Sequence, residues 1–226
     1  MSTSTEAESI FTDEDSARIL DFWFKDIPDY PSIELAAKRW FQVGAAFDDA
    51  CRTNFGSLLS KISPLPAATV TTFATTPQKA LSLLLLLDQF PRNINRADSG
   101  SVYTVTDPLA LAVAQHATSS GLRFDLGPEG AWTGIPMRRC WLYLPFEHSE
   151  DLGAHRRAQE LIEELIRDCK GGKGEEVTGD MLGFLKEHSD VLERFGRYPY
   201  RNEAIGREST KEELEWLEKE RPPWAR

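Results

Sequence analysis

The chain has 226 residues, of which 41% are hydrophobic and 27% charged, and its formal net charge is −10 at pH 7. A chain of this length and composition is typical of a globular protein that buries a substantial core. Its acidic balance argues against non-specific binding to nucleic acid or to anionic membranes. No apolar run approaches the roughly 20 residues that a membrane-spanning helix needs, so neither a nucleic-acid partner nor a membrane partner is expected.

The cysteines and the N-terminal segment indicate a cytoplasmic protein. Cys51, Cys140 and Cys169 are widely spaced and form no CxxC pair, so neither a disulfide framework nor a structural zinc site is predicted. This cysteine usage fits a reducing compartment. Residues 1–11 are small and polar and lack the basic and apolar regions of a signal peptide. We expect a disordered N-terminus over these residues and a single all-helical domain over residues 12–226.

Apolar residues recur at helical spacing along most of the chain. The pattern predicts about eight helices, a loop at residues 64–75 and one candidate strand at 102–105, the helices covering residues 13–24, 32–61, 76–90, 106–120, 136–143, 151–170, 179–195 and 210–217. Ser32 and Thr76 are suited to N-caps, and Thr210 with Glu213 forms a capping-box pattern. Pro145 is expected to stop the helix that ends at residue 143. The predicted fold class is all-α.

A run of five leucines at residues 83–87 is apolar on every side of a helix and is therefore expected to be buried all round. Asp88, Arg92 and Asn93 follow directly. Pro91 is expected to end the helix, because its ring blocks the preceding turn. Polar groups at the end of a buried element indicate a pocket. The alternative is that they satisfy the terminal backbone groups of their own helix.

A second cluster places His148 among Glu147, Glu150 and Asp151. A neighbouring carboxylate orients a histidine ring and favours its charged form, as in general acid–base pairs. Imidazole and carboxylates are also ligands for divalent metals. The simpler interpretation is that Ser149 caps the next helix and that the acidic residues favour its N-terminal dipole. No metal site is therefore predicted.

A third cluster contains four arginines within fourteen residues and no lysine, at Arg194, Arg197, Arg201 and Arg207. The planar guanidinium fork suits bidentate binding of carboxylate or phosphate, so one interpretation is an anion site. The other is that these arginines pair with the acidic residues of the first two clusters. The two interpretations are compatible, because buried ion networks also line active sites.

The three clusters together resemble the family called "domain of unknown function 924". The resemblance rests on LDQFPRN at 87–93, YLPFEHSED at 143–151, RFGRYPYRN at 194–202, GREST at 206–210, FWF at 22–24 and RWF at 39–41. It implies an all-α fold similar to the tetratricopeptide-like superfamily, with stacked antiparallel helix pairs, and no established reaction. Tyr200 departs from the pattern, since the family usually has histidine before Arg-Asn; tyrosine donates a hydrogen bond but does not titrate near neutrality.

We therefore expect the three clusters to meet in one pocket. His148, with Glu147 and Glu150, would carry out proton transfer in an enzyme acting on a small anionic metabolite. The residues expected to bind this ligand are Asp88, Arg92, Asn93, Arg197, Tyr200, Arg201 and Asn202. No cofactor is identified by these residues. The alternative function is a non-catalytic, tetratricopeptide-like module that binds a protein partner, with the polar clusters forming a buried structural network.

Overall fold

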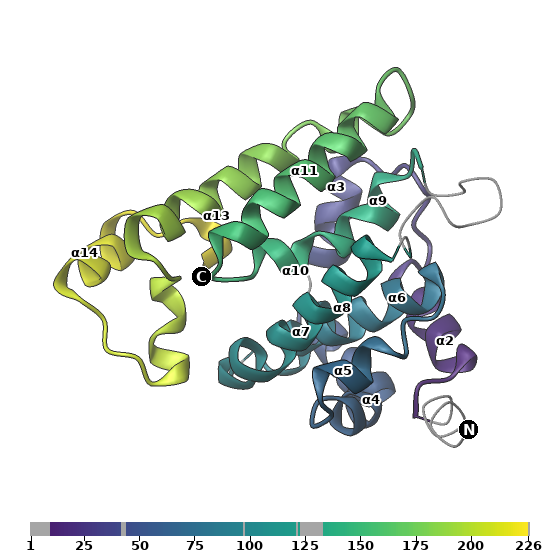
Figure 1. Ribbon diagram of the computed structural model, residues 1–226, viewed down its shortest axis with the longest axis horizontal. Helices are drawn as coiled ribbons and strands as arrows, with labels where there is room; N and C mark the ends of the chain where they lie inside the picture. Colours follow the sequence, from purple (N-terminus) through teal and green to yellow (C-terminus); the bar gives the residue numbers. More distant parts are fainter. Residues whose placement is uncertain (1–9, 42–43, 97, 121, 123–132, 226) are drawn as a thin grey trace.

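The computed structural model describes residues 10–41, 44–96, 98–120, 122 and 133–225, and these ranges form helices and connecting turns without a β-strand (Figure 1). The all-α prediction is confirmed. Most of the N-terminal segment that we expected to be disordered lies outside these ranges. Phe11, at the end of that segment, is 1% exposed and packs in the core beside Phe73.

The helical segments are more numerous and shorter than the eight expected. The α-helices are α2 (Asp13–Trp23), α3 (Ile33–Ala36), α4 (Ala45–Ile62), α5 (Ala67–Thr71), α6 (Pro77–Leu84), α7 (Phe90–Ile94), α8 (Asp107–Ser119), α9 (Pro136–Arg139), α10 (Leu144–Glu147), α11 (Leu152–Cys169), α12 (Glu175–Thr178), α13 (Met181–Phe195) and α14 (Lys211–Lys219). Turns of π-helix form η1 (Ala37–Phe41), η2 (Leu85–Gln89) and η3 (Val102–Thr106). Turns of 3₁₀-helix form η5 (Cys140–Leu142), η6 (Pro199–Arg201), η7 (Glu203–Ile205) and η8 (Pro223–Ala225).

The central element is the continuous run of α6, η2 and α7. The five leucines at residues 83–87 are fully buried, as expected. Helix α6 contacts α2 and α8, and α7 contacts α4. Because the run is covered on all sides, the polar residues at its far end, beginning with Asp88, are held by a rigid scaffold.

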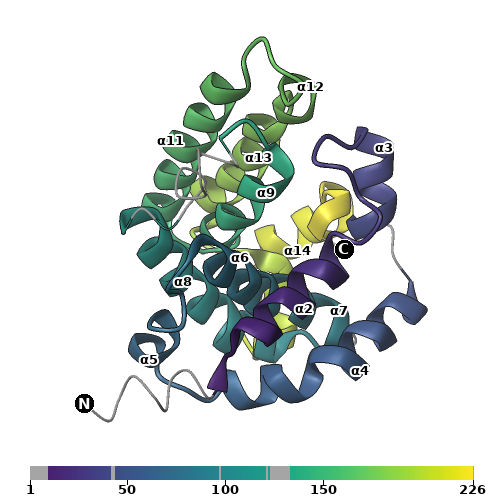
Figure 2. The ribbon, with the colours of Figure 1, turned by 90° about the vertical axis from the view of Figure 1, so that its right-hand side faces the viewer.

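The C-terminal half is built on α11 and α13, which contact each other and run side by side (Figures 1 and 2). Helix α14 lies toward one end of this pair (Figure 1). A small second core joins Val191 and Leu192 of α13 to Tyr198 and to Trp216 of α14. This core fixes the turns η6 and η7, which carry the third polar cluster.

Local capping chemistry explains several helix starts. The side chains of Ser32 and Thr76 accept hydrogen bonds from the first turns of α3 and α6, as predicted. Thr210 and Glu213 form the predicted capping box of α14. Ser149 does not cap α11, contrary to expectation. Asp151 does so instead, and its Oδ1 accepts from the Gly153 N–H at 2.7 Å.

Two prolines do not stop helices as we predicted. Pro91 lies in the first turn of α7, directly after the π-helical turn η2. There the Phe90 N–H bonds to the Leu85 carbonyl, five residues back, and this wider turn accommodates a residue that has no N–H to donate. Pro145 lies in the first turn of α10, where a missing N–H costs nothing.

Three further expectations about local structure are wrong. The helix expected over residues 32–61 is interrupted, and Gly44 is the N-cap of a separate helix α4. The loop expected at 64–75 contains α5, which follows Pro66. The candidate strand at 102–105 is the π-helical turn η3. None of the helices in the described ranges combines the length and the apolar character needed to cross a membrane.

Candidate functional site

The three polar clusters occupy three different elements that converge. The first lies on η2 and α7, the second on and just after α10, and the third on and around η6. Helix α10 contacts α8, α11 and α13, so the second cluster lies between the central run and the C-terminal half. Direct contacts join all three clusters, whereas the single ligand pocket expected from the sequence stays a prediction.

The tightest contact joins the first two clusters through Asp88 and His148. The Nδ1 atom of His148 lies 2.6 Å from Oδ1 of Asp88. Gln89 donates to the other oxygen, Oδ2. Burial raises the pKa of the Asp88 carboxyl, but the charges of His148 and Arg92 and the hydrogen bonds outweigh burial and hold it at about 2. Asp88 is therefore ionised at neutral pH, and its carboxylate accepts a hydrogen bond from the Nδ1–H group.

This hydrogen bond sets the direction of the His148 ring. With Nδ1 directed at Asp88, Nε2 is the nitrogen left for other partners. Nε2 forms no hydrogen bond with the described residues. The His148 side chain is 17% exposed, whereas that of Asp88 is 1% exposed. The pair is thus a buried carboxylate that orients an imidazole at the edge of solvent.

Asp107, the first residue of α8, joins Arg92 to Arg201. Arg92 Nη1 and Nη2 bind the two Asp107 oxygens at 2.7 and 3.2 Å. Arg201 Nη1 lies 3.6 Å from Oδ2 of the same carboxylate. Arg92 also donates to the Asp88 carbonyl at 2.7 Å and lies 3.5 Å from its Oδ1. Two guanidinium groups therefore share one fully engaged carboxylate beside the Asp88–His148 pair.

Arg201 connects the third cluster to the second. Its Nη2 donates to the His148 carbonyl at 2.8 Å. The guanidinium carbon lies 4.5 Å from the ring centroid of Tyr103, 4.6 Å from that of Tyr198 and 5.6 Å from that of Tyr200. Cations are stabilised over aromatic faces, more so away from water, so these rings help to hold a charge that is almost fully buried.

Glu147 and His188 form a second titratable pair on the other side of His148. His188 Nδ1 donates to the Phe184 carbonyl at 2.8 Å and lies 3.4 Å from Glu147 Oε1. Burial and the nearby charges of Asp88 and Glu187 raise the pKa of Glu147 to about 8. Burial, the largest cause, lowers the pKa of His188 to about 3. At neutral pH both groups are therefore uncharged.

The C-terminal segment covers this second pair. The Trp224 ring stacks on that of His188 with centroids 3.6 Å apart, and its indole N–H donates to Glu187 at 2.9 Å. The Arg221 Nε donates to the Ala225 carbonyl at 2.6 Å. These contacts dock the C-terminal segment on α13.

Other predicted site residues are bound within the chain. Glu150 receives both terminal nitrogens of Arg207 at 2.6 and 2.8 Å and the Tyr198 backbone N–H at 2.9 Å. Arg197 binds Glu213 of α14 through two nitrogens at 2.6 and 2.8 Å. The Arg207 contact agrees with the interpretation that the arginines pair with the first two clusters, whereas Arg197 pairs with a glutamate outside both.

Three predicted ligand-binding residues lie at the margins of the cluster. The Asn93 side chain donates to the Gln89 carbonyl at 3.1 Å. Asn202 is buried and donates to Ser209 at 3.1 Å. The Tyr200 hydroxyl accepts from Arg201 Nε at 3.4 Å. Tyr200 thus adjoins the arginine cluster, at the position where the sequence departs from the family pattern.

The chain matches over residues 19–221 the family described as "Bacterial protein of unknown function (DUF924)". That match covers most of the 226 residues. The chain belongs to this family. A solved structure, "Structure of Protein of Unknown Function ATU0120 from Agrobacterium tumefaciens", is similar at 34% sequence identity and a TM-score of 0.65. The similarity covers 90% of this chain and 97% of that chain. No curated protein matches.

Sequence reasoning about this DUF924 chain missed Asp107 as a site residue. Asp107 precedes Pro108 and reads as a helix start, and only the fold shows that it binds two arginines. His188 was not among the expected site residues either. A histidine fewer than two turns before the arginine-rich cluster was the available signal.

Two cavities of this DUF924 chain lie away from the Asp88–His148 pair. One, of about 510 Å³, is bordered by η6, η7 and α14, and the other, of about 590 Å³, by α4 and η3. Neither is lined by Asp88, Arg92 or His148. Within the described ranges, no group of three or more His, Cys, Asp or Glu side chains is placed to hold a metal ion.

Proposed function

We propose that this DUF924 chain is an enzyme that acts on a small molecule by general acid–base chemistry, with His148 as the proton-transfer group. The observation that supports this most is the 2.6 Å contact between Asp88 and His148. An ionised, buried carboxylate on Nδ1 stabilises the imidazolium that forms when Nε2 accepts a proton. Nε2 is the nitrogen left without a partner among the described residues.

In this proposal the acidic residues of the second cluster have different roles. Glu147 is a second proton donor besides His148, since its pKa of about 8 keeps it protonated at neutral pH. Glu150 is a positioning residue, because its carboxylate binds Arg207 and the Tyr198 backbone. Asp88 orients His148 and does not exchange protons near neutrality.

The charge balance of the site supports an anionic substrate. Arg92 and Arg201 carry two positive charges, and Asp88 and Asp107 carry two negative charges. Protonation of His148 therefore leaves this cluster with one net positive charge, which a singly charged anion would neutralise. The Arg92 side chain is 27% exposed, so its outer edge is the cationic surface that such an anion would contact.

A thermal-shift screen against phosphorylated and carboxylated metabolites tests the proposal. The proteins compared are the wild type, His148→Gln and the control His116→Gln, which changes a histidine on α8 outside the site. A ligand at about 100 times its Kd stabilises the folded state by roughly 2.7 kcal/mol. We expect a ligand that stabilises the wild type and His116→Gln but not His148→Gln. A hit that stabilises all three proteins equally contradicts the assignment.

A second candidate is that the clusters form only a structural network. The observation that favours it is that each arginine of the third cluster has a carboxylate partner, Arg194 with Glu212, Arg197 with Glu213, Arg201 with Asp107 and Arg207 with Glu150. This alternative predicts that the screen finds no ligand and that His148→Gln is strongly destabilised. The protein would then act through a protein partner, as a tetratricopeptide-like module.

Two finer predictions are part of the proposal. The contacting pair of α11 and α13, and the contacts of α2 with α6 and of α4 with α7, support stacked helix pairs of the tetratricopeptide-like kind. The cysteines Cys51, Cys140 and Cys169 are free and buried. Free thiols support a cytoplasmic protein.

A further inference from the structure

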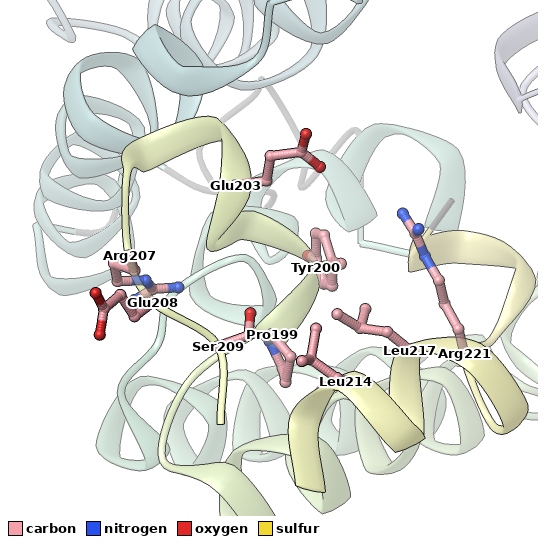
Figure 3. A pocket seen from close by; sticks show the side chains of 9 residues that line it. All are labelled: Pro199, Tyr200, Glu203, Arg207, Glu208, Ser209, Leu214, Leu217 and Arg221. Carbon is pink, nitrogen blue, oxygen red and sulfur yellow. The ribbon is translucent and has the colours of Figure 1, made fainter. Parts of the chain in front are cut away.

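The cavity bordered by η6, η7 and α14 has a composition that differs from that of the acid–base site (Figure 3). Its volume of about 510 Å³ falls within the range of about 300–1,000 Å³ that is typical of small-molecule sites. It is lined by carboxylates, a guanidinium group, hydroxyls and leucines. The groups of this lining that are free to interact indicate which ligand the cavity binds.

The carboxylates of Glu203 and Glu208 are exposed, and neither forms an ion pair with a described residue. In Figure 3 the Glu203 carboxylate lies on the Tyr200 side of the cavity, whereas that of Glu208 extends away beyond Arg207, so Glu203 is the carboxylate that favours a positively charged group on a ligand. Arg207 also lines the cavity, but its two terminal nitrogens are bound to Glu150 at 2.6 and 2.8 Å. Arg207 therefore does not neutralise these two glutamates.

Arg221 supplies the opposite charge. Its Nε donates to the Ala225 carbonyl at 2.6 Å, which fixes the guanidinium plane. Its terminal nitrogens form no ion pair with any described residue. Figure 3 shows the Arg221 side chain and that of Glu203 extending beside the Tyr200 ring from different elements. An anchored guanidinium with free N–H groups suits a carboxylate.

Two hydroxyls next to these charges can donate. Ser209 Oγ accepts from the Asn202 side chain at 3.1 Å, and the Tyr200 hydroxyl accepts from Arg201 Nε at 3.4 Å. Each hydroxyl therefore keeps its own proton for another acceptor. Because the Tyr200 hydroxyl contacts the almost fully buried Arg201, Arg221 is the donor that this cavity offers to an anionic group.

The remaining wall is apolar. Leu214 of α14 is 56% exposed, and Leu217 lies one turn further along the same helix. The close-up shows both leucine side chains on the same side of the cavity, below the Tyr200 ring (Figure 3). A ligand that covers them removes apolar surface from water, which favours binding.

We propose that this cavity binds a zwitterion with an aliphatic body, namely a free amino acid or a dipeptide of the leucine type. The ammonium group lies against Glu203, the carboxylate is held by Arg221, and the aliphatic side chain packs on Leu214 and Leu217. The inference does not depend on the acid–base proposal, because none of its residues belongs to the Asp88–His148 pair.

Isothermal titration calorimetry of the full chain tests this inference with leucine and leucyl-leucine, the two sources of the same chemistry. N-acetylleucine lacks the ammonium group, and leucinamide lacks the carboxylate. We expect at least one zwitterion to bind, and both blocked compounds to bind at least tenfold more weakly, because each of them loses one of the two charged contacts. Absence of binding by both zwitterions, or equal binding of a blocked compound, overturns the inference.

Two substitutions in the lining test whether the zwitterion binds in this cavity. Arg221→Gln and Glu203→Gln should each weaken binding about tenfold, whereas the control Arg157→Gln, on the exposed face of α11, should not change it. Glu203→Gln removes no side-chain ion pair or hydrogen bond with the described residues, so its effect on binding is separate from any effect on their packing. Binding that is unchanged in both Arg221→Gln and Glu203→Gln overturns the assignment to this cavity.

Discussion

The Nδ1–H group of His148 donates a hydrogen bond of 2.6 Å to Asp88, although the two residues are 60 positions apart in the chain. The contact joins the end of a buried leucine helix to a short helix that begins at a proline. Because Asp88 is ionised and almost fully buried, loss of either partner would leave a buried charge without compensation and would destabilise the folded state. This contact is the basis of the acid–base proposal.

Asp88→Asn should destabilise the fold by about 3 kcal/mol at pH 7, because it removes a buried charge that faces His148 and Arg92. The pKa of about 2 in the folded state is below the usual 3.8. Asp88 therefore contributes stability that is present above pH 4 and is lost as the pH falls toward 2. Urea denaturation at pH 7 and pH 3 measures both effects.

The matched control is Asp49→Asn, which changes an exposed aspartate that pairs with Arg52 on α4. We expect it to alter the free energy of unfolding by less than about 1 kcal/mol. Equal effects of the two substitutions would contradict the importance given to the Asp88–His148 pair.

Glu147→Gln should flatten the pH dependence of stability. The folded-state pKa of about 8 exceeds the usual 4.5, so the folded protein holds a proton that the unfolded chain releases. Stability from this group is present below about pH 4.5 and falls by roughly 1.4 kcal/mol per pH unit up to pH 8. Thermal melts of wild type and Glu147→Gln from pH 5 to 9 should diverge, with the variant relatively more stable at high pH. Parallel curves would refute a protonated Glu147.

Arg201→Gln should lower the free energy of unfolding by about 3 kcal/mol. It removes the charge beside Asp107, the hydrogen bond to the His148 carbonyl and a cation enclosed by three tyrosine rings. Urea denaturation measures the loss, with Arg157→Gln as a surface control. A loss below 1 kcal/mol would show that the cluster tolerates an uncharged group there.

Trp224→Ala should raise the pKa of His188 from about 3 toward the usual 6.5, because it removes the ring that helps to keep His188 from water. Titration by NMR is practical because the chain has only four histidines. Trp224→Phe should keep the pKa low, since an aromatic ring still covers the imidazole. A His188 that titrates near 6.5 in the wild type would contradict the docking of the tail.

Local chemistry in the sequence predicted much of the helical layout. Hydroxyl side chains at Ser32, Thr76 and Thr210 mark true helix starts because capping needs only near neighbours. The expectation that Pro91 and Pro145 end helices is wrong, because each lies in the first turn of a new helical segment rather than after the end of the preceding helix. A widened π-helical turn depends on packing around the leucines, and no pattern of adjacent residues reveals it.

In the candidate site, too, the sequence does not reveal contacts between elements that are distant along the chain. The polar clusters were recognisable, and we expected them to meet because polar groups at the end of a buried helix indicate a pocket. The partners themselves were not predictable. Asp107 shared by two arginines, and Glu213 bound to Arg197, depend on contacts between elements that are distant in the sequence.

The most direct test of the central claim is nitrogen-15 NMR of the histidine rings at a pH where His148 is neutral. The proposal predicts that His148 carries its proton on Nδ1, held by Asp88, and leaves Nε2 unprotonated, and that Asp88→Asn alters this tautomer while Asp49→Asn does not. A neutral His148 protonated on Nε2 in the wild type would contradict the claim, because the nitrogen at the solvent edge could not then act as a base.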